Sequence, residues 1–179
     1  MLAELSTPRL LLRTFDESDL DGLTHLVGAR EVASTTLEIP HPYTREMAEA
    51  WLRESREKIA SGESVSYAIV AESQLVGSVG LKVKADHARA ELGYWIGLAY
   101  WGRGYATEAA RAMLEYGFDV MGLNRIFAGY FPRNPASGRV LEKIGMKRDG
   151  VLRQHVMRWG VFEDVILYSM LRSERTAQR

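Results

Sequence analysis

A glycine-rich loop between an expected strand and an expected helix offers the clearest chemistry in this sequence. The stretch from Trp95 to Glu108 reads Trp-Ile-Gly-Leu-Ala-Tyr-Trp-Gly-Arg-Gly-Tyr-Ala-Thr-Glu. The first turn of a helix has unpaired backbone N–H groups and the positive end of the helix dipole. Gly102 and Gly104 have no Cβ, so an anion can approach the backbone closely. The loop is therefore predicted to bind a phosphate or pyrophosphate.

A plainer interpretation of this loop stays open, because two glycines also suit a tight turn that binds nothing. Two common nucleotide motifs are absent. No Gly-Lys-Ser/Thr follows the loop, which excludes a P-loop. Thr107 stands where a dinucleotide-binding fingerprint has its third glycine, which excludes that fingerprint as well.

The elements that must hold this loop follow from the hydrophobic periodicity. We expect strands at 9–15, 65–71, 75–83, 89–97, 125–131, 151–157 and 165–171. We expect helices from Asp16–Asp19 to Val27, from Thr44 to Gly62, from Ala106 over about 15 residues, and from Asn134 to Gly145. In the second helix Met47, Trp51, Ser55 and Ile59 are expected to form one stripe, and residues 28–43 before it are expected to be irregular. This order predicts an α+β (mixed α/β) domain with helices packed on one sheet.

Composition narrows the classes of function. The chain has 179 residues, which suits one domain, and its formal net charge is zero, which argues against wholesale binding of nucleic acid or an anionic membrane. The absence of cysteine excludes a disulfide scaffold, thiol catalysis and cysteine-ligated zinc. The four histidines, His25, His41, His87 and His155, lack ligand spacing, so no metal is expected. With no targeting segment and no apolar run of about 20 residues, a cytoplasmic location is expected.

Several motifs together resemble the GNAT N-acetyltransferase superfamily. The loop Trp101-Gly102-Arg103-Gly104-Tyr105-Ala106 is similar to its acetyl-CoA motif, Gln/Arg-x-x-Gly-x-Gly/Ala. Trp101 departs from the first position, and this departure resembles the RimJ/RimL-type branch, where Tyr-Trp-Gly-Arg/Lys-Gly-Tyr-Ala-Thr-Glu-Ala is usual. The resemblance runs from about Pro8 to Arg172 and includes Pro8-Arg9-Leu10, Leu12-Arg13, Ala90-Glu91-Leu92-Gly93-Tyr94-Trp95, Asn134-x-x-Ser137-x-x-Val140-Leu141-Glu142-Lys143-Ile144-Gly145 and Gly150-Val151-Leu152-Arg153.

This resemblance implies a single GNAT domain at 8–172, followed by a polar tail at 173–179. The implied sheet is central, mostly antiparallel and split into a V, with helices on both faces. We expect the split between the strands at 89–97 and 125–131, with acetyl-CoA as the co-substrate held in it.

The resemblance also implies which residues hold acetyl-CoA. The pantetheine is expected along the backbone of Trp95, Ile96 and Leu98, and the N–H of Ile96 or Gly97 is expected to bond the thioester oxygen. The pyrophosphate is expected on the loop that begins at Trp101, through the N–H groups of Gly102, Arg103, Gly104, Tyr105 and Ala106 and the Thr107 hydroxyl. Asn134 and Ser137 are expected to reach the CoA chain or its sulfur. Arg103, Arg139 and Lys143 are candidates for the 3′-phosphate, or else solvated surface charges.

Two residues are candidates for moving protons in an acetyl transfer. Glu91 is the expected base, because strand alternation places Glu91, Gly93, Trp95 and Gly97 on one side, although it could instead pair with an arginine such as Arg89. Ser137 is the expected partner of the leaving sulfur, or else a hydroxyl that satisfies helix N-terminal N–H groups. Leu141 stands where many GNAT enzymes have a tyrosine acid, and Val156 where RimL-type enzymes have a catalytic glutamate.

The implied activity is N-acetyl transfer by direct attack of a primary amine. We expect the α-amine of a protein or peptide N-terminus, such as that of a ribosomal protein, with residues 28–43 lining its site. A small-amine acceptor (polyamine or aminoglycoside) and a non-catalytic acyl-CoA-binding domain stay open as alternatives. No nucleic-acid or membrane partner is expected, and a homodimer is compatible with the sequence.

Overall fold

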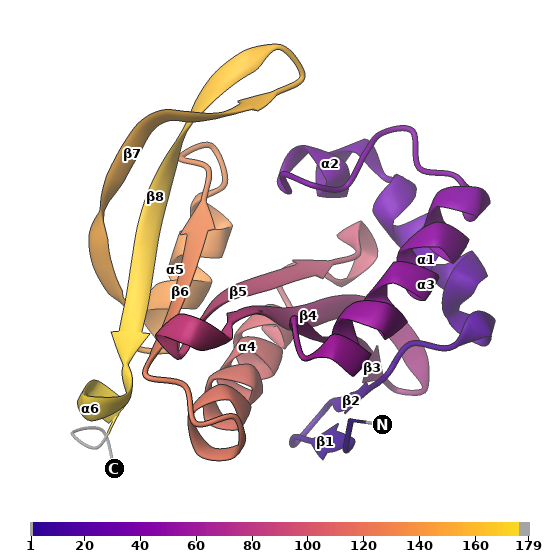
Figure 1. Cartoon of the computed structure of the whole chain (residues 1–179). Coiled ribbons are helices and arrows are strands. Elements are labelled where there is room, and N and C mark those ends of the chain that lie inside the picture. Colours follow the sequence, from indigo (N-terminus) through magenta and orange to yellow (C-terminus); the bar gives the residue numbers. More distant parts are fainter. Residues whose placement is uncertain (1, 176–179) are drawn as a thin grey trace.

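One eight-stranded sheet organises the computed structural model, which describes residues 2–175 (Figure 1). Its strands are β1 (Leu5–Ser6), β2 (Leu11–Arg13), β3 (Ser64–Ala71), β4 (Gln74–Lys84), β5 (Arg89–Ile96), β6 (Arg125–Tyr130), β7 (Lys147–Arg158) and β8 (Val161–Leu171). They lie in the order β1-β2-β3-β4-β5-β6-β8-β7. Every neighbouring pair is antiparallel except β5 and β6, which are parallel. The predicted α+β class and mostly antiparallel sheet are confirmed.

The sheet divides between β5 and β6. These strands pair only through Arg89↔Arg125, Ala90↔Ile126 and Glu91↔Phe127. Beyond Glu91 and Phe127 the two strands diverge, and Figure 1 shows them as the two arms of a V. The split therefore lies where it was expected, and it leaves one edge of β5 open over its last residues.

The helices begin and end at residues with suitable local chemistry. They are α1 (Leu20–Gly28), α2 (Arg30–Ser34), α3 (Arg45–Ser61), α4 (Tyr105–Glu115), α5 (Pro135–Lys143) and α6 (Arg172–Arg175). The Thr44 hydroxyl accepts a hydrogen bond from the Met47 N–H at the start of α3, and Gly62 ends that helix with a φ of 77°. The expected long helix after the glycine loop is shorter, because a π-helical turn follows α4 over Tyr116–Val120.

Two details in the N-terminal half differ from expectation. Residues 28–43 are not wholly irregular, because they contain the short helix α2. The buried residues of α3 are Ala48, Leu52 and Ser55. Of the expected stripe, Ser55 is buried and Trp51 packs against the same cluster, whereas Met47 is 41% exposed. Helical spacing predicts a stripe but does not choose between adjacent stripes, and packing against β3 and α1 makes that choice.

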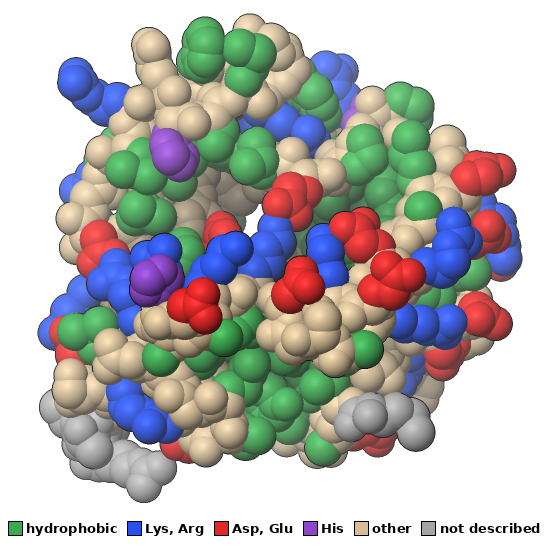
Figure 2. Space-filling view, viewed as in Figure 1, with side chains coloured by type: hydrophobic (Ala, Val, Ile, Leu, Met, Phe, Trp, Pro, Cys, Tyr) green, Lys and Arg blue, Asp and Glu red, His purple; other side chains and the backbone are tan. Residues whose placement is uncertain are grey.

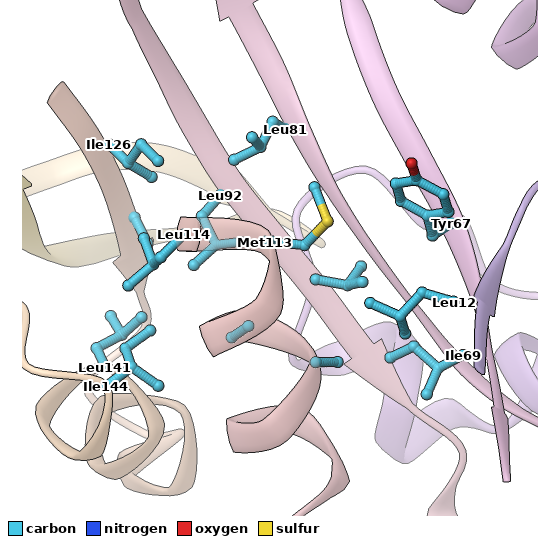
Figure 3. Close-up of a cluster of buried hydrophobic side chains, with 14 of the residues drawn as sticks. Leu12, Tyr67, Ile69, Leu81, Leu92, Met113, Leu114, Ile126, Leu141 and Ile144 are labelled. Carbon is cyan, nitrogen blue, oxygen red and sulfur yellow. The ribbon is translucent and has the colours of Figure 1, made fainter. Parts of the chain in front are cut away.

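Two hydrophobic clusters hold helices on both faces of the sheet. The larger lies under α4 and α5, and the residues labelled in Figure 3 belong to it: Leu12, Tyr67, Ile69, Leu81, Leu92, Met113, Leu114, Ile126, Leu141 and Ile144. The smaller lies under α1 and α3 on the opposite face: Phe15, Leu20, Leu23, Val27, Ala48, Leu52 and Ala68. The expected placement of helices on both faces is thus confirmed.

The β7–β8 hairpin is longer than the strands expected at 151–157 and 165–171, although its turn is at Trp159-Gly160 as predicted. Its tip extends toward α2, on the other arm of the V (Figure 1). Helix α6 begins at Arg172 and extends into the segment at 173–179 that was expected to be a polar tail, and residues 176–179 of that tail lie outside the described residues.

The surface fits the charge balance of the sequence. Figure 2 shows Lys and Arg interspersed with Asp and Glu across the face in view. No helix within residues 2–175 is both long enough and apolar enough to span a membrane. In the same residues no cluster of His, Asp and Glu has the arrangement of a metal site.

Candidate active site

The glycine loop turns β5 into α4 and leaves the first turn of α4 open. Gly102 and Gly104 have φ values of 77° and 82°, a conformation that residues with a Cβ rarely adopt. Gly104 occupies the N-cap position of α4 and contributes no side-chain cap, so the N–H groups of the first turn are available to a ligand. A Cβ built on Gly102 meets nothing within 4 Å, so the space beside it is open. This geometry fits an anion such as a pyrophosphate.

Trp101 closes the loop onto the strand that precedes it. Its indole N–H donates a 2.6 Å hydrogen bond to the carbonyl oxygen of Ile96, the last residue of β5. The departure from Gln or Arg at this position therefore has a structural consequence, because the indole joins the middle of the loop to the end of β5. The Arg103 guanidinium folds back over the Tyr100 ring and donates to the Ala99 carbonyl oxygen.

Hydrogen bonds from Thr7 and Arg9, in the N-terminal segment, also hold the loop and the start of α4. Arg9 Nε donates to Glu108 Oε2 at 2.7 Å, and Arg9 Nη1 donates to the carbonyl oxygen of Arg103 at 2.9 Å. The Thr7 hydroxyl donates to the other Glu108 oxygen at 2.7 Å. Burial acts to raise the pKa of Glu108, but the hydrogen bonds from Thr7 and Arg9 outweigh it, so the net pKa is lowered.

At the split, successive side chains of β5 point to opposite faces of the sheet. Leu92 and Ile96 are buried in the cluster under α4, and Tyr94 packs against the same cluster. Trp95 packs instead against the cluster under α1 and α3, and a Cβ built on Gly97 would lie 2.5 Å from Leu26 of α1. The expected grouping of Glu91 with Trp95 and Gly97 follows from this alternation. The even-numbered side chains of β5 therefore lie on the α4–α5 face of the sheet, and the odd-numbered ones lie on the α1–α3 face.

The backbone N–H and C=O groups of β5 also alternate, so that some face β4 and others face the open edge of the strand. The Gly97 N–H donates to the Val76 carbonyl oxygen at 2.9 Å, so it is already used within the sheet. The Trp95 carbonyl oxygen lies against β4, where a Cβ built on Gly77 would approach it to 2.3 Å. By the alternation of strand hydrogen bonding, the backbone of Ile96 faces the opening of the V. Leu98 lies in the turn after β5 and is 44% exposed.

Glu91 lies at the last paired position of β5, at the point where the V opens. Its side chain is exposed, and among the described residues it forms no hydrogen bond or ion pair. The alternative of a carboxylate engaged by Arg89 is not seen, because the Arg89 guanidinium lies over the Phe127 ring. Within the described part of the chain, the Glu91 carboxylate is thus exposed and unpaired at the point where the V opens.

The N-terminus of α5 faces the same opening from the other arm. The Asn134 side chain accepts a hydrogen bond from the Ser137 N–H, so Asn134 caps the helix. The Ser137 hydroxyl does not serve as a cap. It lies 2.8 Å from the Tyr94 hydroxyl, which also donates to the Ser137 carbonyl oxygen at 3.1 Å. Burial raises the pKa of Tyr94 to about 12.

Two positions at which similar enzymes have an acid or a base carry apolar residues in this chain. Leu141 is fully buried in the cluster under α4 and α5. Val156 pairs with Glu163 across the β7–β8 hairpin, after an irregularity between Leu152 and Val156. The Glu163 carboxylate accepts from Arg133 Nε at 2.7 Å, next to the start of α5.

Of the candidates for the 3′-phosphate, Lys143 lines one cavity together with Gly104 and Thr107 at the start of α4. Arg139 and Lys143 are exposed on α5, and within residues 2–175 neither side chain forms an ion pair. Arg103 is held on its own loop. Of the three, Lys143 is thus placed beside the first turn of α4.

Three residues of the site were not singled out from the sequence. Tyr94, Glu108 and Arg158 each lie in or near a recognised motif, but each acts on a residue distant in the chain. The Arg158 guanidinium, at the end of β7, donates to the carbonyl oxygens of Ala33, Leu37 and Ile39. It thereby ties the hairpin tip to the segment expected to line the acceptor site. The motifs include or adjoin these three residues, but their partners are visible only in the tertiary structure.

Comparison with known proteins agrees with this geometry. The profile of the Acetyltransferase (GNAT) domain matches residues 9–147. The uncharacterized N-acetyltransferase YnaD of Bacillus subtilis is 33% identical over 172 residues, covering 95% of this chain and 98% of that protein. The ribosomal protein uS5-alanine N-acetyltransferase of Escherichia coli is 27% identical over 110 residues, covering 60% of this chain and 57% of that protein. The solved structure of RimL, a ribosomal-protein α-N-acetyltransferase in complex with coenzyme A, has a TM-score of 0.89 at 18% identity, over 96% of this chain and 99% of that chain.

A split sheet with an open helix N-terminus beside it defines an acetyltransferase fold, and the chain belongs to the GNAT acetyltransferase family. It is an N-acetyltransferase, as the sequence motifs predicted, and its relatives include ribosomal-protein N-acetyltransferases such as the Escherichia coli enzyme.

Proposed function

We propose that this protein transfers the acetyl group of acetyl-CoA directly to the α-amine of a protein or peptide N-terminus. The observation that carries the proposal is the placement of Glu91 and Ser137 around the opening of the V. Glu91 lies on β5 at the split, on the side of Trp95 and the α1–α3 helices. Ser137 lies on α5, which packs with α4 on the opposite face. An acceptor and a thioester can therefore meet at β5 from opposite faces.

The residues of the chain suit acetyl-CoA as the acetyl donor. The unpaired N–H groups at the start of α4, with the Thr107 hydroxyl nearby, would hold the pyrophosphate. At the open edge of β5 the Ile96 N–H would bond the thioester oxygen. The Ile96 carbonyl oxygen, which already accepts from Trp101, has a second lone pair for an N–H of the pantetheine. Asn134 and Ser137 at the start of α5 would lie along the rest of the arm. When bound, acetyl-CoA supplies an activated acetyl group.

Each proton has a proposed carrier in the chain. Glu91 accepts the proton of the attacking amine, directly or through one water. Ser137 donates a hydrogen bond to the departing sulfur. The chain has no cysteine, so no cysteine acyl-enzyme can form and direct attack is the simplest route.

The class of acceptor is inferred from the ordinary pKa values of amines and from the exposed apolar side chains near the site. An α-amine titrates near pH 7.7–8.0 and a lysine amine near about 10.4, so far more α-amine is neutral at pH 7. One exposed carboxylate suits that easier nucleophile. Exposed apolar side chains also gather at the hairpin tip and on the segment that Arg158 binds: Leu37, Met157, Trp159, Val161 and Phe162. They would accept the side chains that follow the N-terminus of a peptide. The Escherichia coli relative is named as an N-acetyltransferase of a ribosomal protein, which supports the same class of acceptor.

The proposal is tested by offering several amines in parallel with acetyl-CoA. These are peptides with free N-termini, the same peptides blocked at the α-amine, spermidine and an aminoglycoside, with mass spectrometry locating the added acetyl group. We expect acetylation at the α-amine and none on the blocked peptides. Preferred turnover of spermidine or the aminoglycoside, with peptides inert, would contradict the N-terminal acceptor.

A further inference from the structure

Tyr94 joins the two arms of the V on the α4–α5 face of the sheet. Its ring belongs to β5, and its hydroxyl contacts Ser137 in the first turn of α5 at both the side chain (2.8 Å) and the carbonyl oxygen (3.1 Å). Tyr94 lies beyond Glu91, the last residue of β5 that pairs with β6. The contact therefore crosses the opening at the point where the strands no longer hold each other.

The Ser137 hydroxyl needs such a partner if it is to act in one direction. A serine hydroxyl rotates freely and can donate only one hydrogen bond. Within residues 2–175 no other side chain hydrogen-bonds the Ser137 hydroxyl. Leu141, one turn further along α5, is fully buried and has no polar atom to offer.

We infer that Tyr94 is a positioning residue for acetyl transfer, which holds the Ser137 hydroxyl so that its hydrogen points to the departing sulfur. This inference rests on the proposed function. The single hydrogen of the Tyr94 hydroxyl lies between Ser137 Oγ at 2.8 Å and the Ser137 carbonyl oxygen at 3.1 Å, and both accept it in a three-centre hydrogen bond. Because Ser137 Oγ then acts as an acceptor toward Tyr94, the Ser137 O–H stays free to donate to the sulfur. Hydrogen bonds in such a chain polarise one another, so the second bond is strengthened by the first.

The step balances without a net proton loss from either hydroxyl. The amine nitrogen forms a bond to the acetyl carbon and gives a proton to Glu91. The carbon–sulfur bond breaks, and its electron pair goes to the sulfur, where the Ser137 hydroxyl stabilises the thiolate. The thiolate then takes a proton from Glu91 or from solvent. Because burial raises the pKa of Tyr94 to about 12, the tyrosine keeps its proton throughout.

The test is a double-mutant cycle on Tyr94→Phe and Ser137→Ala. We expect Tyr94→Phe to lower kcat about 10-fold and to leave the KM for acetyl-CoA within about 2-fold, because it removes one hydrogen bond that acts through Ser137. In the Ser137→Ala background the same change should lower kcat by less than about 2-fold. Because Tyr94 does not titrate, the defect should also be constant from about pH 6 to about pH 9.

A matched control removes another phenol hydroxyl that binds the same helix. Tyr168 donates to the Glu142 carboxylate of α5 at 3.0 Å, and Tyr168→Phe should leave kcat unchanged. Purely structural roles for Tyr94 predict either an equal loss in both backgrounds or a loss shared by Tyr168→Phe, and either result overturns the inference. An unchanged kcat in Tyr94→Phe overturns it as well.

The outcome is separable from that of the proposed function. If no amine is acetylated, the same cycle is measured on hydrolysis of acetyl-CoA by water, which breaks the same carbon–sulfur bond. Hydrolysis with a non-additive cycle would support the role of Tyr94 and contradict the proposed acceptor. A wild-type protein that is inert in both assays contradicts both proposals.

Discussion

The carboxylate of Glu108 on α4 binds the guanidinium of Arg9, a residue 99 positions earlier in the chain, at 2.7 Å. The same carboxylate accepts from the backbone N–H of Arg9 and from the Thr7 hydroxyl. Arg9 in turn holds the Arg103 carbonyl oxygen and lies over the Tyr105 ring. The glycine loop is therefore braced by the N-terminal segment, and its shape depends on a contact outside the loop.

Removing the Glu108 charge should weaken both the fold and the binding of acetyl-CoA. Hydrogen bonds to a charged group contribute about 1.5–3 kcal/mol each when partly buried, so Glu108→Gln should lower the free energy of unfolding by about 2 kcal/mol near pH 7. The exposed residue Glu115, further along the same helix, provides the control as Glu115→Gln, with a change under about 0.5 kcal/mol expected. Urea unfolding and calorimetric titration with acetyl-CoA measure the two effects.

The same contact predicts a pH dependence of stability. The folded-state pKa of Glu108 is lowered from its ordinary value of 4.5, so its contribution is fully present above about pH 4.5 and is lost as the pH falls through the folded-state value. The stability difference between wild type and Glu108→Gln should thus be constant from about pH 7 to about pH 5 and shrink below that range. A difference that grows on acidification would contradict this sign.

Gly104→Ala should strongly reduce acetyl-CoA binding. The residue has a φ of 82°, and a Cβ there would lie 3.3 Å from Arg9 Nη2, beside the N–H groups that face the ligand. Gly62→Ala is the matched control, because Gly62 has a φ of 77° and an added Cβ meets nothing within 4 Å. Both variants should lose about 1 kcal/mol of stability from the backbone conformation.

The two glycine variants should differ in their response to ligand. At 100 times its Kd, acetyl-CoA should add about 2.7 kcal/mol to the stability of wild type and of Gly62→Ala, and far less to Gly104→Ala. Thermal unfolding with increasing acetyl-CoA measures this. A flat titration of the wild-type protein at millimolar ligand would show that the loop is only a turn.

Glu91→Gln should slow acetyl transfer about 10²-fold while leaving acetyl-CoA affinity unchanged, because it removes only the base. The deficit should shrink as the pH rises, since more of the amine is then neutral without help. Glu57→Gln changes another exposed carboxylate, on α3, and should have no effect. Wild-type rates for Glu91→Gln near neutral pH would make Glu91 a structural residue.

Arg158→Met should raise the KM for a peptide acceptor about 10-fold and leave the KM for acetyl-CoA unchanged, because the hairpin tip would no longer hold the segment at Ala33–Ile39. The loss of hydrogen bonds from a charged group should also lower stability by about 1–3 kcal/mol. Arg153→Met, at an exposed position of the same strand, is the control. Equal effects on both KM values would point to a general loss of structure instead.

Local features of this protein followed from the sequence alone. Thr44, Gly62 and Asn134 act on backbone groups within a few residues, so their effect on helix ends does not depend on the rest of the chain. The glycines at 102 and 104 likewise predicted a loop with an open helix N-terminus, because only the backbone conformation of the loop is involved. The order of strands and helices came from periodicity, and the position of the split from the family motifs.

The tertiary structure decided the contacts that join distant parts of the chain. Tyr94 meets Ser137 across 43 positions, Arg9 meets Glu108 across 99, and Arg158 meets Ala33 across 125. No periodicity or spacing specifies such pairs, because each depends on how the packed elements are placed relative to one another. The choice of the Ala48–Leu52 stripe on α3 over its neighbour has the same origin. The sequence therefore determined which backbone groups would be open to a ligand, and packing of the sheet and helices decided which side chains surround them.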